Sequence, residues 1–123
     1  MSKLQFSVYE FMSIVGYMDE ELKGQKAAPG SVYNEWIDQW RDLEKRSDAL
    51  GPMERADLLF DGKVTINAIT ADHLREVIEV VSIIYKMNEK MVEDDDPDAD
   101  EEDVSLWRNR LRELNGVLAS FGA

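Results

Sequence analysis

The 123-residue chain contains no cysteine and a single histidine. Without cysteine it has no disulfides, no thiolate nucleophile and no cysteine-ligated zinc or iron–sulfur site. No apolar run approaches the roughly 20 residues that span a bilayer, and the N-terminal residues lack the long apolar segment of a secretory signal. We therefore expect a cytoplasmic protein.

Basic residues are scarce, with 14 Lys and Arg against 26 Asp and Glu, which gives a net charge of −12. Nucleic acids and anionic membranes are bound through clustered Lys and Arg, and the sequence has no such cluster. We expect neither direct nucleic-acid binding nor membrane binding. The length suits one domain, and 44% hydrophobic with 33% charged residues is typical of a globular protein.

Apolar residues recur at helical spacing over most of the chain. Ser2 with Gln5 fits a capping box, and it precedes an apolar heptad pattern that runs from Leu4 to Leu22. This pattern predicts a first helix that begins near Ser2. Ser31 is the predicted N-cap of a second helix.

Three more helices are predicted towards the C-terminus. Gly51 followed by Pro52 is typical of a helix start, because proline suits the first turn. Thr70 is the predicted N-cap of a long helix that is apolar on more than one face, and a last helix follows from residue 104. Residues 58–69 fit either a hairpin at Asp61-Gly62 or a helix end followed by an extended connector, and we expect the connector.

Together these patterns predict an all-α fold. We expect an antiparallel bundle of four to five helices in a single domain, residues 1–123, with an acidic loop at residues 93–103 before the last helix.

The acidity of the chain is local. Residues 93–103, here called the acidic run, hold nine carboxylates, whereas the rest of the chain holds 17 acidic and 14 basic residues. Concentrated charge of this kind steers association with an oppositely charged partner. The nine candidate partner-binding carboxylates are Glu93, Asp94, Asp95, Asp96, Asp98, Asp100, Glu101, Glu102 and Asp103.

The acidic run also has a purely local interpretation. Carboxylates from Asp100 onward suit the start of the last helix, because its macrodipole favours negative charge there. The others repel one another, as in a solvated loop that only increases solubility. A calcium loop is not predicted, because the run lacks the required glycine and ligand spacing. We expect no metal ion and no cofactor.

Trp36 and Trp40 lie one helical turn apart in the second predicted helix. Beside Ile37 and Leu43 they fit a buried face. A tryptophan left exposed there would be a candidate anchor for a partner, because tryptophan is enriched at binding hot spots.

The leading hypothesis is a small non-enzymatic protein that binds another protein with a basic surface and modulates or inhibits it. A nucleic-acid-handling protein with a basic groove is the specific version, in which the acidic run partly mimics nucleic acid. An alternative is an assembly protein that forms a homodimer or larger oligomer through its apolar long helix.

A second alternative is enzymatic. Glu76 and Glu79 form an E-x-x-E motif, and Glu93 and Asp96 form E-x-x-D. The pair resembles the motifs with which all-α nucleotide pyrophosphohydrolases of the MazG type hold magnesium. The resemblance implies a magnesium-dependent nucleotide hydrolase. The sequence departs from the pattern because Asp96 precedes Pro97, which disfavours helix at Asp96.

Overall fold

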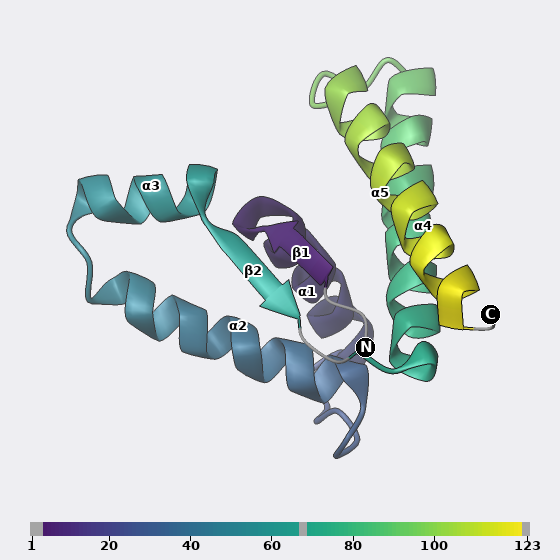
Figure 1. Ribbon diagram of the computed structural model, residues 1–123. Helices are drawn as coiled ribbons and strands as arrows, with labels where there is room; N and C mark the ends of the chain where they lie inside the picture. The colour runs from purple at the N-terminus through teal and green to yellow at the C-terminus, as the bar shows by residue number, and fades with distance from the viewer. Residues whose placement is uncertain (1–3, 67–68, 122–123) are drawn as a thin grey trace. The chain divides into compact units, whose positions relative to one another are not determined.

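The computed structural model describes residues 4–66 and 69–121. The chain forms two compact units, unit 1 (Met1–Ile69) and unit 2 (Thr70–Ala123). Within the described residues unit 1 contains a strand, three helices and a second strand, and unit 2 contains two helices (Figure 1). In chain order the elements are β1 (Leu4–Ser7), α1 (Val8–Leu22), α2 (Val32–Asp48), α3 (Pro52–Asp61), β2 (Lys63–Ile66), α4 (Ala71–Glu93) and α5 (Glu101–Phe121).

The predicted predominance of helix is confirmed, but the fold is not purely helical. The two strands pair in antiparallel fashion, with Leu4 opposite Ile66 and Phe6 opposite Val64. These four side chains are buried, whereas Gln5 between them is exposed. The alternation gives the sheet one apolar face, as expected for a half-buried antiparallel pair. The single antiparallel bundle and the single domain stay predictions.

The predicted start of the first helix is wrong. Residues Leu4–Ser7 form β1, and α1 begins at Val8. The N-cap is Ser7, whose Oγ accepts from the N–H of Glu10 at 3.1 Å, and Glu10 Oε1 accepts from the N–H of Ser7 at 2.9 Å. This is a capping box, five residues later than predicted. The proposed cap, Ser2, lies outside the described residues.

The prediction for residues 58–69 is partly right. Helix α3 ends at Asp61 and an extended segment follows, as expected, and no hairpin forms at Asp61-Gly62. The extended segment is a strand rather than a connector, because β2 pairs with β1 from the other end of unit 1.

The core of unit 1 lies where the apolar face of the sheet meets the helices. Trp36 on α2 contacts Phe6 edge to face at 5.5 Å between ring centroids, and it contacts Phe11 on α1 at 5.2 Å. Aromatic pairs at such distances add to the free energy gained by burial. The buried apolar residues of unit 1 are Leu4, Phe6, Val8, Phe11, Ile14, Val15, Met18, Val32, Trp36, Ile37, Leu43, Val64, Ile66 and Ile69.

The short turn between α2 and α3 is held by one arginine. Pro52 occupies the first turn of α3, as predicted. Arg55 Nε donates to the carbonyl of Ser47 at 3.2 Å, and its Nη2 donates to those of Asp48 at 3.5 Å and Leu50 at 3.3 Å. The guanidinium therefore satisfies carbonyl groups that the end of α2 leaves without helical partners.

Unit 2 is a helical hairpin in which α5 returns along α4 (Figure 1). The predicted N-cap, Thr70, is confirmed, because its Oγ1 accepts from the N–H of His73 at 3.1 Å. The residues of α4 that are apolar and buried are Leu74, Val77, Val80, Val81 and Ile84, and those of α5 are Val104, Trp107 and Leu114. The apolar residues that suggested an oligomer are thus mostly buried within the chain itself.

Candidate functional site

The acidic run forms the turn of the α4–α5 hairpin. Glu93 is the last residue of α4, and Glu101, Glu102 and Asp103 form the first turn of α5. The remaining five carboxylates, from Asp94 to Asp100, belong to the connection. The predicted acidic loop therefore lies between the two helices but is shorter than predicted, because Glu93 belongs to α4 and the last three carboxylates belong to α5.

The end of α4 adopts a Schellman motif built from aspartates. The N–H of Asp96 donates to the carbonyl of Met91 at 3.0 Å, and the N–H of Asp95 donates to that of Val92 at 3.2 Å. Asp95 has a φ of 54°, in the left-handed region. Glycine is the usual residue at this position, because a Cβ makes the left-handed conformation unfavourable.

Two aspartates of the run serve as local caps. Asp100 Oδ1 accepts from the N–H of Glu102 at 2.8 Å, which makes Asp100 the N-cap of α5. Asp96 Oδ1 accepts from the N–H of Asp98 at 2.8 Å. Both contacts need only a side-chain carbonyl oxygen, so asparagine could replace either residue and keep the hydrogen bond.

The two halves of the run differ in their local electrostatics. The carboxylates at the start of α5 face the positive end of a helix macrodipole and are stabilised by it. Those from Glu93 to Asp96 lie at the negative end of α4, where the macrodipole opposes them. The carboxylate side chains from Glu93 to Glu102 are exposed and form no ion pair with any residue that the structure describes.

A polar cleft of about 390 Å³ lies beside the run in unit 2. Its lining consists of Glu89, Val92, Glu93, Glu101, Val104, Ser105 and Arg108. Arg108 is held by Tyr85, whose hydroxyl accepts from Arg108 Nε at 3.4 Å and donates to Glu89 Oε2 at 2.8 Å. This hydrogen bond raises the pKa of Arg108 above its ordinary value. The arginine is therefore engaged by the tyrosine, and it forms no ion pair with the carboxylates from Glu93 to Glu102.

The residues of the predicted magnesium motifs do not converge. Glu79 and Glu93 both lie on α4, 14 residues apart, so at the rise of an α-helix they are separated by about 21 Å. Asp96 lies beyond the end of that helix. The four side chains cannot share one ion in this arrangement. Among the described residues no group of three acidic or histidine side chains is close enough to hold a metal ion.

The structure separates the two predicted tryptophans. Trp36 is 2% exposed and belongs to the core, so its assignment as a partner-binding residue is corrected. Phe6 of β1 contacts the Trp36 ring, and the sequence pattern predicted a helix rather than a strand for this segment. Trp40 is half-buried, and its ring centroid lies 6.4 Å from that of Phe11. Trp40 thus remains a candidate anchor.

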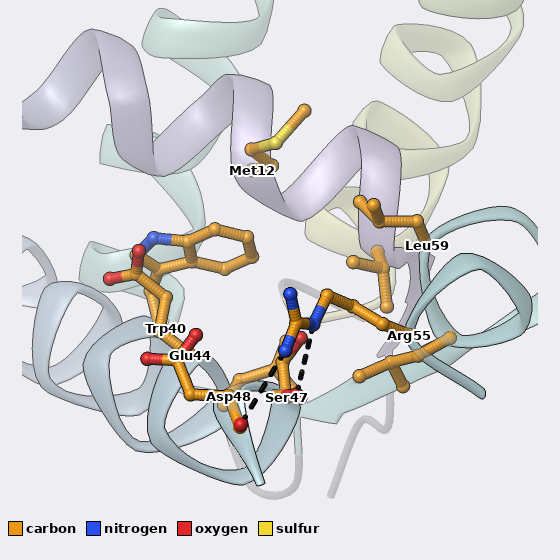
Figure 2. Close-up of a pocket in the computed structure, with 10 residues that line it drawn as sticks. Met12, Trp40, Glu44, Ser47, Asp48, Arg55 and Leu59 are labelled. Atoms are coloured by element: carbon orange, nitrogen blue, oxygen red, sulfur yellow. Dashed lines mark hydrogen bonds between the residues drawn. The ribbon is translucent and has the colours of Figure 1, made fainter. Parts of the chain in front are cut away.

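Trp40 lines an apolar groove that sequence reasoning missed, here called the unit 1 groove (Figure 2). The groove has a volume of about 180 Å³ and is lined by Val8, Met12, Trp40, Leu43, Glu44, Ser47, Asp48, Arg55, Leu58 and Leu59. The lining comes from α1, α2 and α3, and no motif in the sequence brings these three segments together. The only signal in the sequence was Trp40 itself, a tryptophan that would be a candidate anchor if it were exposed.

Comparison with known proteins gives no relative. No protein-family model, no curated protein and no solved structure matches the chain. Within residues 4–66 and 69–121, no helix combines the length and apolar character that crossing a membrane requires.

Proposed function

We propose that the chain is a non-enzymatic protein that binds another protein and modulates or inhibits it through the acidic run. Its partner carries a basic surface. In the specific version the partner handles nucleic acid, and the carboxylates occupy part of the basic groove that phosphates otherwise fill. The protein would act in the cytoplasm and need no cofactor.

The observation that carries the proposal is the placement of like charge at the end of α4. Carboxylates at the start of α5 have a structural reason, because they stabilise that helix. Those from Glu93 to Asp95 have none, since they oppose the macrodipole, repel one another and include a strained left-handed residue. Residues that cost stability without a local gain are typical of binding sites.

The exposure of these carboxylates supports the same proposal. A cationic partner can reach the side chains from Glu93 to Glu102 without first breaking an internal ion pair. Their clustering at one turn favours a compact basic patch over a long duplex-binding surface, because duplex phosphates extend at one charge per about 1.7 Å.

The test uses a variant that removes charge and keeps the local caps. Asp94, Asp95, Asp96, Asp98 and Asp100 are replaced by asparagine, which preserves the acceptor oxygens at positions 96 and 100. A partner captured from a lysate is identified and purified, and its Kd is measured by calorimetry between about 0.05 M and about 0.5 M salt. We expect binding to weaken by at least about tenfold at low salt and to lose most of its salt dependence.

The matched control removes five carboxylates elsewhere, at exposed positions of unit 1: D19N, E20Q, E54Q, D57N and D61N. This control should bind nearly as well as the parent protein. If the two variants bind equally, the acidic run only increases solubility and the proposal fails. Sedimentation at several concentrations accompanies the assay, because a stable dimer would favour the assembly alternative.

A further inference from the structure

We propose that the unit 1 groove is a second binding surface, which takes two turns of a basic amphipathic helix from a partner protein. This surface shares no residue with the acidic run, since all of its residues belong to α1, α2 and α3 in unit 1. The two proposals can therefore fail independently.

The size of the groove favours side chains over a small molecule. Ligand pockets usually enclose about 300–1,000 Å³, whereas this groove encloses about 180 Å³. Six of its ten lining side chains are apolar. Met12 and Leu59 are 37% and 39% exposed, although both are large and apolar. The groove is thus an apolar surface in contact with water, and it has room for anchoring side chains only.

The shape of the groove favours a helix as the occupant. Five lining residues of α2 follow one stripe of that helix: Trp40, Leu43, Glu44, Ser47 and Asp48. Eight residues separate the first from the last, which corresponds to about 12 Å along the axis. This length matches two turns of a partner helix, whose apolar residues at positions i, i+4 and i+7 would enter the groove.

Two carboxylates beside the groove favour a basic occupant. Glu44 and Asp48 are exposed, lie one turn apart and form no ion pair with any described residue. Arg55 is the one cation in the lining, and its guanidinium is directed at the carbonyls at the end of α2 (Figure 2). A partner helix with Lys or Arg one turn apart would pair with the two carboxylates.

The same charges argue against a second copy of the chain. Helix α3 has the right shape to be the occupant, because Met53 and Phe60 lie two turns apart and are each 83% exposed. However, α3 also carries Glu54, Asp57 and Asp61. Placed against Glu44 and Asp48, these carboxylates would repel, so the acidic rim selects a basic helix from another protein.

The experiment is a selection of random peptides about four helical turns long against the intact protein. Selected peptides should contain apolar residues at helical spacing together with Lys or Arg. Their binding is then measured by fluorescence anisotropy against variants whose fold is checked by circular dichroism. Trp40→Ala should weaken binding by at least about tenfold. The double variant E44Q/D48N, which changes only exposed side chains, should weaken it by about three- to tenfold at low salt.

Two control variants separate this surface from the rest of the molecule. E54Q/D57N removes the same charge from α3 outside the groove lining and should leave peptide binding unchanged. The five-asparagine variant of the acidic run should also bind the peptides like the parent protein. The proposal is overturned if no peptide prefers the parent protein to Trp40→Ala, if the selected peptides lack basic residues, or if E44Q/D48N binds as tightly as E54Q/D57N.

Discussion

Asp95 offers the sharpest test of how α4 ends. Its φ of 54° places a residue with a Cβ where helices usually carry glycine. Its carboxylate also lies at the negative end of the α4 macrodipole. Asp95→Asn removes the charge and keeps the side-chain shape, whereas Asp95→Gly removes both the charge and the Cβ. The two substitutions therefore separate an electrostatic cost from a backbone cost.

The magnitudes follow from these two costs. Relieving an unfavourable charge at a helix end is worth about 0.3–1 kcal/mol, so Asp95→Asn should raise the free energy of unfolding by that amount. The left-handed conformation costs a residue with a Cβ about 1–2 kcal/mol. Part of this gain is lost, because glycine has greater conformational freedom in the unfolded chain, and ordering it costs about 0.5–1 kcal/mol. Asp95→Gly should therefore stabilise by about 1–2 kcal/mol in total, which raises the Tm by several degrees.

The assay is urea unfolding followed by circular dichroism at about 0.02 M and about 0.5 M salt. The gain from Asp95→Asn should shrink at high salt, whereas the additional gain from Asp95→Gly should persist because it arises in the backbone. Asp98→Asn is the control, since it removes the same charge from the same run beyond the end of α4. If Asp95→Gly is no more stable than Asp95→Asn, residue 95 is not left-handed and the Schellman motif is wrong.

Two further substitutions test unit 1 by the same unfolding measurement. Gly62→Ala should lower the free energy of unfolding by about 1–3 kcal/mol. A Cβ at this position would collide with the Leu58 carbonyl oxygen and approach Val8 Cγ2 to 2.9 Å. Unchanged stability would contradict this packing. Trp36→Ala should lower the free energy of unfolding by about 3–5 kcal/mol, because the ring is buried against Phe6. A loss below about 1 kcal/mol, which is typical of a surface position, would show that the ring is not part of the core.

Much of the helical structure could be predicted, because helix starts depend on local chemistry. Ser31 and Thr70 cap their helices as expected, and Pro52 occupies a first turn. The strands could not be assigned with the same rules. Leu4 satisfies both a heptad spacing and a strand alternation, and only its partner Ile66, at the far end of unit 1, decides between them.

The candidate sites, too, could be predicted only where neighbouring residues determine them, and not where distant segments do. The acidic run is visible as composition, and its position between two helices follows from Pro97 and the charges at the start of α5. The role of Asp95 depends on backbone conformation, which composition does not reveal. Trp36 and Trp40 are equivalent in sequence pattern, but β1 brings Phe6 over Trp36, which also lies closer to Phe11 than Trp40 does.

The pairing of β1 with β2 also affects how the two units reach their folded states. The strands enclose nearly all of unit 1, so this sheet cannot form during synthesis until residue 66 has left the ribosome. Closing so long a loop carries an entropic cost that contacts between neighbouring segments avoid. The α4–α5 hairpin joins adjacent segments and has a lower contact order. It should therefore form faster than the sheet that ties the beginning of unit 1 to its end.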